Sequence, residues 1–312
     1  MHRLIIIAGP TAVGKTAYAI RLAQELNTEI ISCDSRQFYQ EMDIGVARPS
    51  PEELAAVKHH FIACRSVTKP YNVYDYEHDV LRLLDTLFEK HETVIAAGGS
   101  GLYIDAICNG INIMPDPTPE LRAELSSRIA NGELPALLEE LKQLDPDYYA
   151  IVDRNNPIRI QRAIEVIRTS GQPYSKLIGK PLPKRNFEIS ITVLNRERDE
   201  MRDRIYRRVD MMVDNGLLDE ARSLLPFRNI NTLNTVGYRE LFEYFDGECT
   251  LEEAITNIKN HTWQYAKKQI TWLKRYERMY SSFFRSCEGI PSFFRSCERT
   301  KARKHAGRGQ NG

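Results

Sequence analysis

The sequence predicts an α/β fold in which a mostly parallel sheet is flanked by helices and interrupted by a helical insertion. Three observations predict it: short apolar runs that alternate with helical patterns, a glycine-rich turn directly after the first run, and a proline-punctuated stretch without a clear strand. Strands that alternate with helices form parallel sheets, because each helix returns the chain to the same end of the sheet. The length of 312 residues allows one such core and a smaller insertion.

Four apolar runs, each bounded by polar or glycine-rich residues, are predicted to be strands. They cover residues 4–8, 30–33, 93–97 and 189–194. Apolar residues then recur at helical spacing, which predicts helices after the first and the fourth strand and again over residues 251–280. This alternation gives the core its predicted parallel order.

The stretch between the third and fourth strands is predicted to hold the insertion. Pro157 fits the first turn of a helix, Ile160, Ile164 and Ile167 form one apolar face, and Gly171 fits the end. We therefore expect a discontinuous core over residues 1–114 and 184–281, and a helical insertion domain over residues 115–183. A seven-residue repeat at 282–288 and 292–298 opens a basic end, so residues 282–312 are predicted to form a disordered tail.

The composition is that of a folded protein, with 42% hydrophobic and 27% charged residues. No apolar run is long enough to span a membrane, and the six cysteines are scattered, which favours a reducing cytoplasm over a zinc site or a disulfide framework. The net charge of +1 does not by itself indicate a nucleic-acid binder. Basic residues crowd two segments, 196–208 and 267–278, and such segments can hold RNA on one face.

The glycine-rich turn after the first strand matches the P-loop pattern G-x-x-x-x-G-K-[ST]. Its residues are Gly9, Pro10, Thr11, Ala12, Val13, Gly14, Lys15 and Thr16. Backbone amides at a helix N-terminus bind phosphate, a lysine reaches the terminal phosphates, and a threonine hydroxyl can hold Mg²⁺. The core is therefore predicted to be P-loop NTPase-like, and its ligand to be ATP, another nucleotide or a non-nucleotide diphosphate. A chance glycine turn is the alternative.

Polar residues follow two further strands, and the carboxyl ends of parallel strands meet at one edge of a sheet. Asp34 follows the second strand, and Ser100 follows the third in a Gly98-Gly99-Ser100 turn. We expect the P-loop, Asp34 and Ser100 to line one crevice. Asp34 is a candidate magnesium ligand or general base, with a turn or capping residue as the alternative. The two glycines are candidates for a close backbone approach to a ligand.

Two basic segments allow two interpretations each. Arg204 and Arg208 lie one helical turn apart and either clamp phosphate oxygens or form a solvated face paired with neighbouring acids. The stretch from Trp263 to Tyr276 interleaves both tryptophans with lysine and arginine. It indicates either single-stranded RNA recognition, which we favour, or an amphipathic helix with its rings packed inward.

Together these motifs resemble one family, the bacterial tRNA dimethylallyltransferases (tRNA isopentenyltransferases, the IPP transferase family). The matching landmarks occur in the family's order and cover nearly all of residues 1–280. They are residues 9–16, Asp34-Ser-Arg-Gln-Phe-Tyr39, Met42-Asp-Ile-Gly45, Gly98-Gly-Ser-Gly-Leu-Tyr103, Asn156-Pro157 with Arg159, Arg162, Ala163 and Glu165, Gly237-Tyr-Arg-Glu240, and Ala266-Lys-Lys-Gln-Ile-Thr-Trp272. Any one of them can arise by chance, whereas the ordered set is specific.

The resemblance implies transfer of a dimethylallyl group from dimethylallyl diphosphate to the exocyclic N6 amine of the adenosine 3′ to the anticodon, with Mg²⁺ and release of diphosphate. It implies catalytic roles for Asp34, Ser100 and Arg204, a diphosphate site at residues 9–16, and a metal contact at Thr16. It further implies tRNA contacts. These are Asp34, Ser35, Arg36, Gln37, Ser100, Arg122, Ile158, Arg159, Ile160, Gln161, Arg162, Lys268, Gln269, Lys274 and Arg275.

The sequence departs from the family pattern at three points. Ser100 stands where relatives more often have threonine, the tail after about residue 280 has no counterpart, and the zinc finger of the eukaryotic relatives is absent. The partners that the resemblance implies are the tRNA anticodon stem-loop and the prenyl donor, with no membrane. We expect a cytoplasmic monomer.

Three rival functions stay open. A P-loop core equally suits a small-molecule or nucleotide kinase, which would turn over ATP. An adenylate isopentenyltransferase would use the same donor on free AMP, ADP or ATP. A non-enzymatic RNA-binding module leaves Lys15 and Asp34 without a task.

Overall fold

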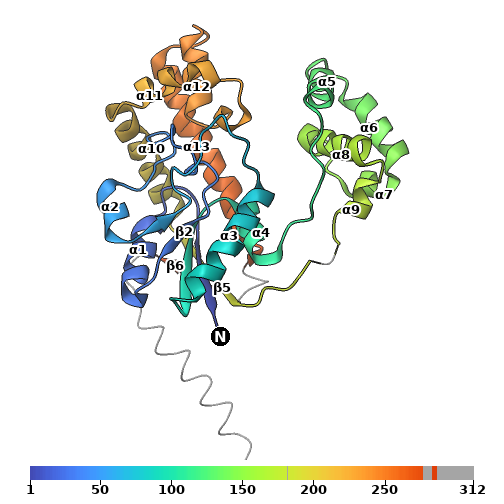
Figure 1. Cartoon of the computed structure of the whole chain (residues 1–312). Coiled ribbons are helices and arrows are strands. Elements are labelled where there is room, and N and C mark those ends of the chain that lie inside the picture. The colour runs from blue at the N-terminus through green and yellow to red at the C-terminus, as the bar shows by residue number, and fades with distance from the viewer. Residues whose placement is uncertain (181, 277–282, 287–312) are drawn as a thin grey trace, which may run out of the picture. The chain divides into compact units, whose positions relative to one another are not determined.

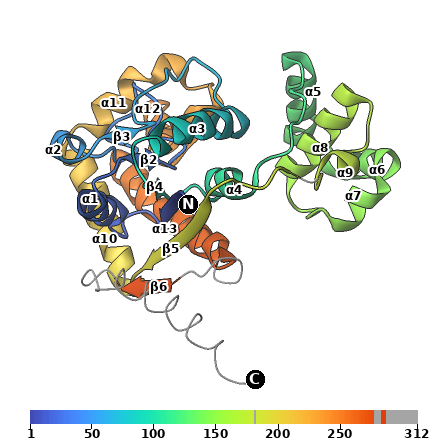
Figure 2. The ribbon, with the colours of Figure 1, turned by 60° about the horizontal axis from the view of Figure 1, so that its bottom comes forward.

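The computed structural model describes residues 1–180, 182–276 and 283–286. Its six-stranded sheet has the order β3-β2-β4-β1-β5-β6, and β2 pairs in parallel with both β3 and β4, as β5 does with β6 (Figure 2). The strands are β1 (Arg3–Ala8), β2 (Ile30–Ser32), β3 (His59–His60), β4 (Thr93–Gly98), β5 (Glu188–Asn195) and β6 (Phe283–Ser286). The predicted α/β fold with a parallel sheet and flanking helices is confirmed.

The four predicted strands correspond to β1, β2, β4 and β5, with ends that differ by one residue. The sequence did not reveal the two edge strands. β3 has only two residues, both histidines, and β6 lies in the repeated tail. Short edge strands lack the apolar run that marks a buried strand, because they need not bury both faces.

The chain divides into two compact units. Residues 4–68, 93–99 and the described residues from 189 onward form the sheet unit. Its helices are α1 (Lys15–Leu26), α2 (Pro51–Ala56), α10 (Arg198–Asp214), α11 (Leu217–Ser223), α12 (Tyr238–Phe245) and α13 (Leu251–Leu273), with short 3₁₀ helices at Leu225–Phe227 and Asn231–Leu233. The last helix was predicted to cover residues 251–280, whereas α13 ends at Leu273. Residues 277–280 lie outside the described part of the chain.

Residues 1–3, 69–92 and 100–188 form the helical unit. Its helices are α3 (Val73–Phe88), α4 (Gly101–Asn109), α5 (Pro119–Ala130), α6 (Leu134–Leu144), α7 (Pro146–Ile151), α8 (Pro157–Ser170) and α9 (Tyr174–Leu177). Helices α5 to α9 gather in one cluster (Figure 1) around a core that includes Leu137, Leu141, Ile160 and Ile164, all fully buried. The predicted helix between Pro157 and Gly171 is confirmed.

Helices α3 and α4 group with the insertion helices in this division, although the predicted insertion covered only residues 115–183. Arg185, which follows the insertion in the sequence, joins α3 and α4 within this unit. It pairs with Glu77 of α3 and donates to the carbonyl oxygens of Ala106 and Ile107 at the end of α4, while Glu77 also accepts from the amide of Ile111. The predicted domain boundaries stay a prediction.

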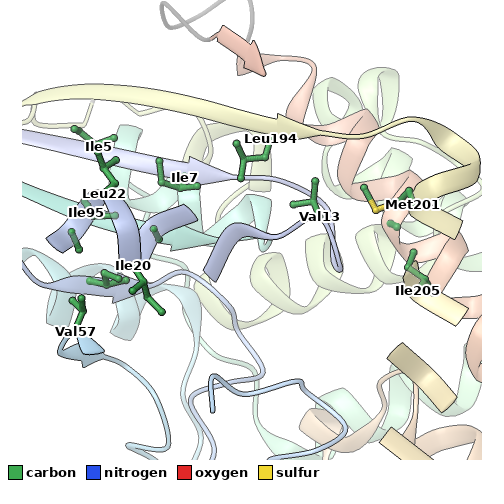
Figure 3. Close-up of a cluster of buried hydrophobic side chains, with 14 residues drawn as sticks. Ile5, Ile7, Val13, Ile20, Leu22, Val57, Ile95, Leu194, Met201 and Ile205 are labelled. Atoms are coloured by element: carbon green, nitrogen blue, oxygen red, sulfur yellow. The ribbon is translucent and has the colours of Figure 1, made fainter. Parts of the chain in front are cut away.

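The core of the sheet unit anchors the glycine-rich turn. Side chains from β1, α1, α10 and α13 form one cluster, in which Ile7, Val13, Leu194 and Ile205 are fully buried (Figure 3). Val13 belongs to the turn itself, and complete burial of a side chain of this size stabilises the fold by about 1.5–3 kcal/mol. The turn is therefore fixed to the hydrophobic core through one of its own residues.

The tail predicted to be disordered over residues 282–312 is described only at Phe283–Ser286, the strand β6, and the rest of it lies outside the described residues. Among the described helices, none is long and apolar enough to cross a membrane.

Candidate active site

The turn between β1 and α1 has the backbone geometry of a phosphate-binding loop. Helix α1 begins at Lys15 after Gly14, whose φ of 105° lies in the left-handed region that favours glycine. The Lys15 Nζ donates to the carbonyl oxygen of Pro10 at 2.8 Å. A helix N-terminus and an ammonium group thus meet at one short loop, and both attract a bound anion.

Two arginines that follow β5 hold this loop by its carbonyl oxygens. Arg204 Nε donates to the oxygen of Ala12 at 2.8 Å, and Arg196 Nε donates to that of Val13 at 3.0 Å. In a trans peptide the N–H points opposite to the C=O. The two contacts therefore turn the amides of Val13 and Gly14 away from the arginines.

Arg204 and Arg208 on α10 have different surroundings from nearby arginines that pair with acids. Two acids of that helix pair with Arg196 and Arg202. Arg204 and Arg208 instead line a cavity, which favours the phosphate-clamp interpretation over a solvated charged face. Burial lowers the pKa of the Arg208 guanidinium, and the negative charge of Asp34 acts in the opposite direction. Arg208 keeps its charge, since an arginine pKa starts far above neutral pH.

The cavity has a volume of about 720 Å³, within the usual range of about 300–1,000 Å³ for small-molecule sites. It lies within the sheet unit, and both Lys15 and Asp34 line it, so the predicted crevice shared by the P-loop and Asp34 is confirmed. Its P-loop and β2-end residues are Thr11, Ala12, Gly14, Lys15, Thr16, Asp34, Ser35, Arg36 and Gln37. The lysine of the P-loop and a carboxylate therefore face the same space.

Asp34 satisfies both interpretations made from the sequence. Its Oδ1 accepts a hydrogen bond from the amide of Arg36 at 3.0 Å, and its own amide donates to Ser32 Oγ at 3.3 Å, which makes a tight turn after β2. The same half-buried side chain lines the cavity. The turn thus fixes the carboxylate at the cavity wall.

Several lining residues carry no motif that the sequence alone could interpret. Residues 45–48 and 235–237 form two loops of the wall, Glu53 reaches it from α2, and apolar side chains complete it. The apolar set is Ile205, Val209, Met211, Met212, Leu217, Val236 and Ile258. Met42-Asp-Ile-Gly45 and Gly237-Tyr-Arg-Glu240 are landmarks of the family resemblance, and this was the only available signal for the two loops.

Gln269 bridges the P-loop and the end of β4, although the resemblance implied a tRNA contact. Its Oε1 accepts from the amide of Thr11 at 2.9 Å, and its Nε2 donates to the carbonyl oxygen of Gly99 at 2.9 Å. Only 7% of this residue is exposed. Each end of the buried amide thus makes a hydrogen bond within the protein, and the tRNA contact of Gln269 stays a prediction.

The glycines after β4 permit a close approach, but to the protein itself. A Cβ on Gly98 would lie 2.4 Å from the backbone of Cys33, and a Cβ on Gly99 would lie 2.3 Å from Gln269 Nε2. The predicted approach to a ligand is replaced here by packing between neighbouring segments. Ser100 is the N-cap of α4 and belongs to the helical unit, so its predicted role in the crevice stays a prediction.

The tRNA contacts implied for the helical unit differ in their surroundings. Arg122 lies 3.5 Å from the buried Glu165, and Gln161 donates to Glu165 and to Ser126. Ile160 is fully buried in the unit's core, which leaves its side chain no surface for RNA.

Ile158 differs from these neighbours, because it is 76% exposed at the start of α8. Arg159 is also exposed, whereas Arg162 is half-buried. The start of α8 therefore exposes one apolar and one basic side chain.

The basic end of α13 combines both interpretations made from its composition. Trp263 packs against the core of the sheet unit, as the amphipathic interpretation requires, and the Lys267 Nζ lies over its ring. The Arg275 guanidinium lies 4.1 Å from the centre of the Trp272 ring. Lys268, Lys274 and Arg275 are exposed and present their charges on the surface.

Among the described residues no group of three or more His, Cys, Asp or Glu side chains could hold a metal ion. The cavity nevertheless offers a hydroxyl at Thr16 and a carboxylate at Asp34. Mg²⁺ commonly binds through one or two protein oxygens together with substrate phosphates and water. This donor set fits a magnesium ion that arrives with a diphosphate, and does not form a cage for a resident ion.

Comparisons with known proteins give a consistent answer. The family model described as IPP transferase matches residues 37–276. The chain is 47% identical over 275 residues to tRNA dimethylallyltransferase 2 of Parabacteroides distasonis, covering 88% of this chain and 92% of the relative. It is also 47% identical over 272 residues to tRNA dimethylallyltransferase 1 of Phocaeicola vulgatus, covering 87% and 91% of the two chains.

Solved structures agree. The tRNA isopentenylpyrophosphate transferase of Bacillus halodurans superposes with a TM-score of 0.67 at 33% identity, over 98% of this chain and 96% of that one. A eukaryotic dimethylallyltransferase that acts on tRNA superposes with a TM-score of 0.77 at 21% identity, which speaks for the fold alone. On the family match, the identity and the coverage together, the chain belongs to the IPP transferase family.

Proposed function

We propose that this chain transfers a dimethylallyl group from dimethylallyl diphosphate to the exocyclic N6 amine of the adenosine 3′ to the anticodon in tRNA. The observation that carries the proposal is the single cavity lined by both Lys15 and Asp34. The family membership and the names of the relatives support the same activity.

The donor end of the cavity suits a diphosphate leaving group. Diphosphate gains negative charge as the bond from its oxygen to the allylic carbon breaks. Lys15 and Arg204 line the cavity beside the amides of the P-loop, and fixed cations and dipoles of this kind stabilise charge that develops in a transition state. In this proposal the P-loop holds a group that departs, and no phosphoryl group is transferred.

The acceptor end suits removal of a proton. The amine of adenine is a poor nucleophile, because its lone pair is shared with the ring. As N6 forms its bond to the allylic carbon, the electron pair of the breaking C–O bond leaves with the diphosphate, and one N6 proton passes to the Asp34 carboxylate. General base catalysis by a positioned side chain contributes about 10²–10⁴-fold to rate.

Magnesium fits the donor end. Thr16 would hold the ion together with the phosphate oxygens of the donor, and the ion would supply charge neutralisation for the diphosphate. Arg204 and Lys15 then hold the remaining phosphate oxygens, and Asp34 is left as the proton acceptor.

The tRNA surface follows from the residues that remain exposed. We infer contacts by residues 34–37 with the target base, by Arg122, Ile158 and Arg159 in the helical unit, and by Lys268, Lys274 and Arg275 at the end of α13. Exposed cations bind phosphate without regard to sequence. The target base must leave its stack, which costs about a few kcal/mol and least in a loop. We further propose that Ser100 acts near the base and that the protein works as a monomer in the cytoplasm.

A labelled-donor assay tests the proposal. Radiolabelled dimethylallyl diphosphate is incubated with the protein, Mg²⁺ and an unmodified anticodon stem-loop, and label should enter the RNA without ATP. Label in free AMP, but not in the stem-loop, would select the adenylate isopentenyltransferase. No label in either, with ATP turnover instead, would select the kinase.

A further inference from the structure

The loop of residues 43–45 is held by one carboxylate from a distant helix. Glu220 of α11 accepts from three consecutive backbone amides: those of Asp43 at 2.9 Å, Ile44 at 2.8 Å and Gly45 at 2.9 Å. Its Oε1 also accepts from the Tyr238 hydroxyl at 2.7 Å. Glu220 therefore receives four hydrogen bonds on two oxygens, the geometry that a carboxylate can fill and an amide cannot.

Close packing adds to this contact. A Cβ on Gly45 would lie 2.6 Å from the ring and from the hydroxyl oxygen of Tyr238. The Tyr238 side chain is fully buried, so it cannot move aside without opening the core. The loop is thus pressed against Tyr238 while Glu220 holds its amides.

The next part of the same loop forms the cavity wall. Residues 45–48 line the cavity, as does Gln37. Gln37 Nε2 donates to the carbonyl oxygen of Ala47 at 3.0 Å, and Gln37 Oε1 accepts from Ser32 Oγ at 3.3 Å. The position of the Gln37 amide therefore depends on where the loop lies.

We propose that Glu220 is a positioning residue for the acceptor side of the cavity. It acts through the loop of residues 43–48, which it fixes at one end, on Gln37, which the loop fixes at the other. The inference rests on the proposed function, in which residues 34–37 meet the target base. Glu220 makes no contact with the P-loop among the hydrogen bonds of the described residues, so the donor side is held independently.

The test compares Glu220→Gln with Asp219→Asn. The first substitution keeps the size of the side chain but turns an amide group toward N–H or O–H donors. Asp219 is the neighbouring acid on α11, 85% exposed in its side chain and 3.8 Å from its partner Arg222, and it serves as the matched control. Thermal unfolding of each variant shows whether it is folded at the assay temperature.

For Glu220→Gln we expect the KM for the anticodon stem-loop to rise about tenfold or more, since hydrogen bonds to a charged group are among the stronger ones. The KM for dimethylallyl diphosphate should stay within about twofold, because the P-loop contacts remain. Tyr238→Phe removes one of the four donors to Glu220 and should raise the KM for the stem-loop by a smaller factor. Equal changes in both KM values, or none in either, would overturn the positioning role.

A second readout needs no activity. Hydrogen exchange at the amides of residues 43–45 should become faster in Glu220→Gln and stay unchanged in Asp219→Asn. If the unmodified protein transfers no label to the stem-loop, the proposed function fails, whatever the exchange rates are. If it transfers label and the Glu220→Gln variant keeps both KM values, only the positioning inference fails.

Discussion

Two walls of the same cavity are built in different ways. The P-loop wall comes from eight contiguous residues of one motif, with Lys15 hydrogen-bonded to Pro10 and Val13 buried beneath it. Arg204 and Gln269 support it from distant parts of the sequence. The wall of residues 43–48 contains no chemical motif, and it is held by Glu220 and Tyr238, both distant in the sequence. A phosphate-binding motif identifies the first wall in the sequence, whereas no chemical motif identifies the second.

This difference separates donor from acceptor. In the proposed reaction the P-loop wall holds the diphosphate, and the second wall lies beside Gln37 and the target base. A variant in one wall should therefore change the kinetic constants for one substrate only. Asp34 acts on both substrates at the moment of transfer, so its loss should lower kcat.

The largest effect is expected at Asp34. Asp34→Ala should lower kcat by about 10²–10⁴-fold and leave stem-loop binding largely intact, because the proton acceptor is lost while the basic surfaces remain. Asp34→Asn is the decisive partner variant: its Oδ1 can still accept from the Arg36 amide, so the turn survives without the base. Single-turnover rates and equilibrium RNA binding are measured for both. An Asn variant with near-normal turnover would assign Asp34 to the turn alone.

The fold and about half of the site followed from the sequence. Apolar runs predicted four strands because buried parallel strands need them, and the P-loop and Asp34 were found because each directly follows such a strand. The bridging contacts of Gln269 were not predicted, since its position among lysines on a basic helix gave no sign that it is buried. Glu220 could not be predicted, because its function exists only through amides that are distant in the sequence. Sequence patterns report local periodicity, whereas such contacts depend on the completed fold.

The next largest effect is expected in the P-loop wall, at Arg204. Arg204→Ala removes the hydrogen bond to the Ala12 carbonyl oxygen and a cation beside the diphosphate, and should lower kcat/KM for dimethylallyl diphosphate by about 10–100-fold. Arg202→Ala is the matched control, because Arg202 lies on the same helix and pairs with Asp199 at 3.9 Å. Steady-state kinetics with each substrate varied in turn decide the outcome. A rise in the stem-loop KM of similar size would erase the separation between the two walls.

A smaller effect is expected at Gln269, the buried side chain that connects the P-loop to the end of β4. Gln269→Leu leaves the Thr11 amide and the Gly99 carbonyl without their partner, at a cost of about 1–3 kcal/mol in the free energy of unfolding for each buried group. The affinity for dimethylallyl diphosphate should also fall, because the P-loop loses a support. The exposed Gln264→Leu on the same helix controls for added apolar surface. Denaturant unfolding and donor titration measure both quantities, and unchanged donor affinity would make Gln269 a stability residue only.

The smallest expected effect is a pH dependence of the free energy of unfolding, caused by Tyr238 beside the wall of residues 43–48. Burial raises the pKa of the Tyr238 hydroxyl far above its usual value near 10, and the charge of Glu220 adds to the shift. A raised pKa in the folded state means that the unfolded chain releases this proton first. The stability that Tyr238 contributes is therefore complete below about pH 10 and declines as the pH rises, by at most about 1.4 kcal/mol per pH unit.

Tyr238→Phe removes that titration, so its free energy of unfolding should fall less steeply above about pH 10 than that of the unmodified protein. Two half-buried tyrosines of the helical unit, Tyr148 and Tyr174, also have raised pKa values and contribute equally to both proteins. The difference between the two slopes is thus the property of Tyr238 alone. Parallel slopes would mean that the hydroxyl ionises as readily in the folded protein as in the unfolded one. The second wall would then be held by Glu220 and the loop amides without a buried, neutral tyrosine.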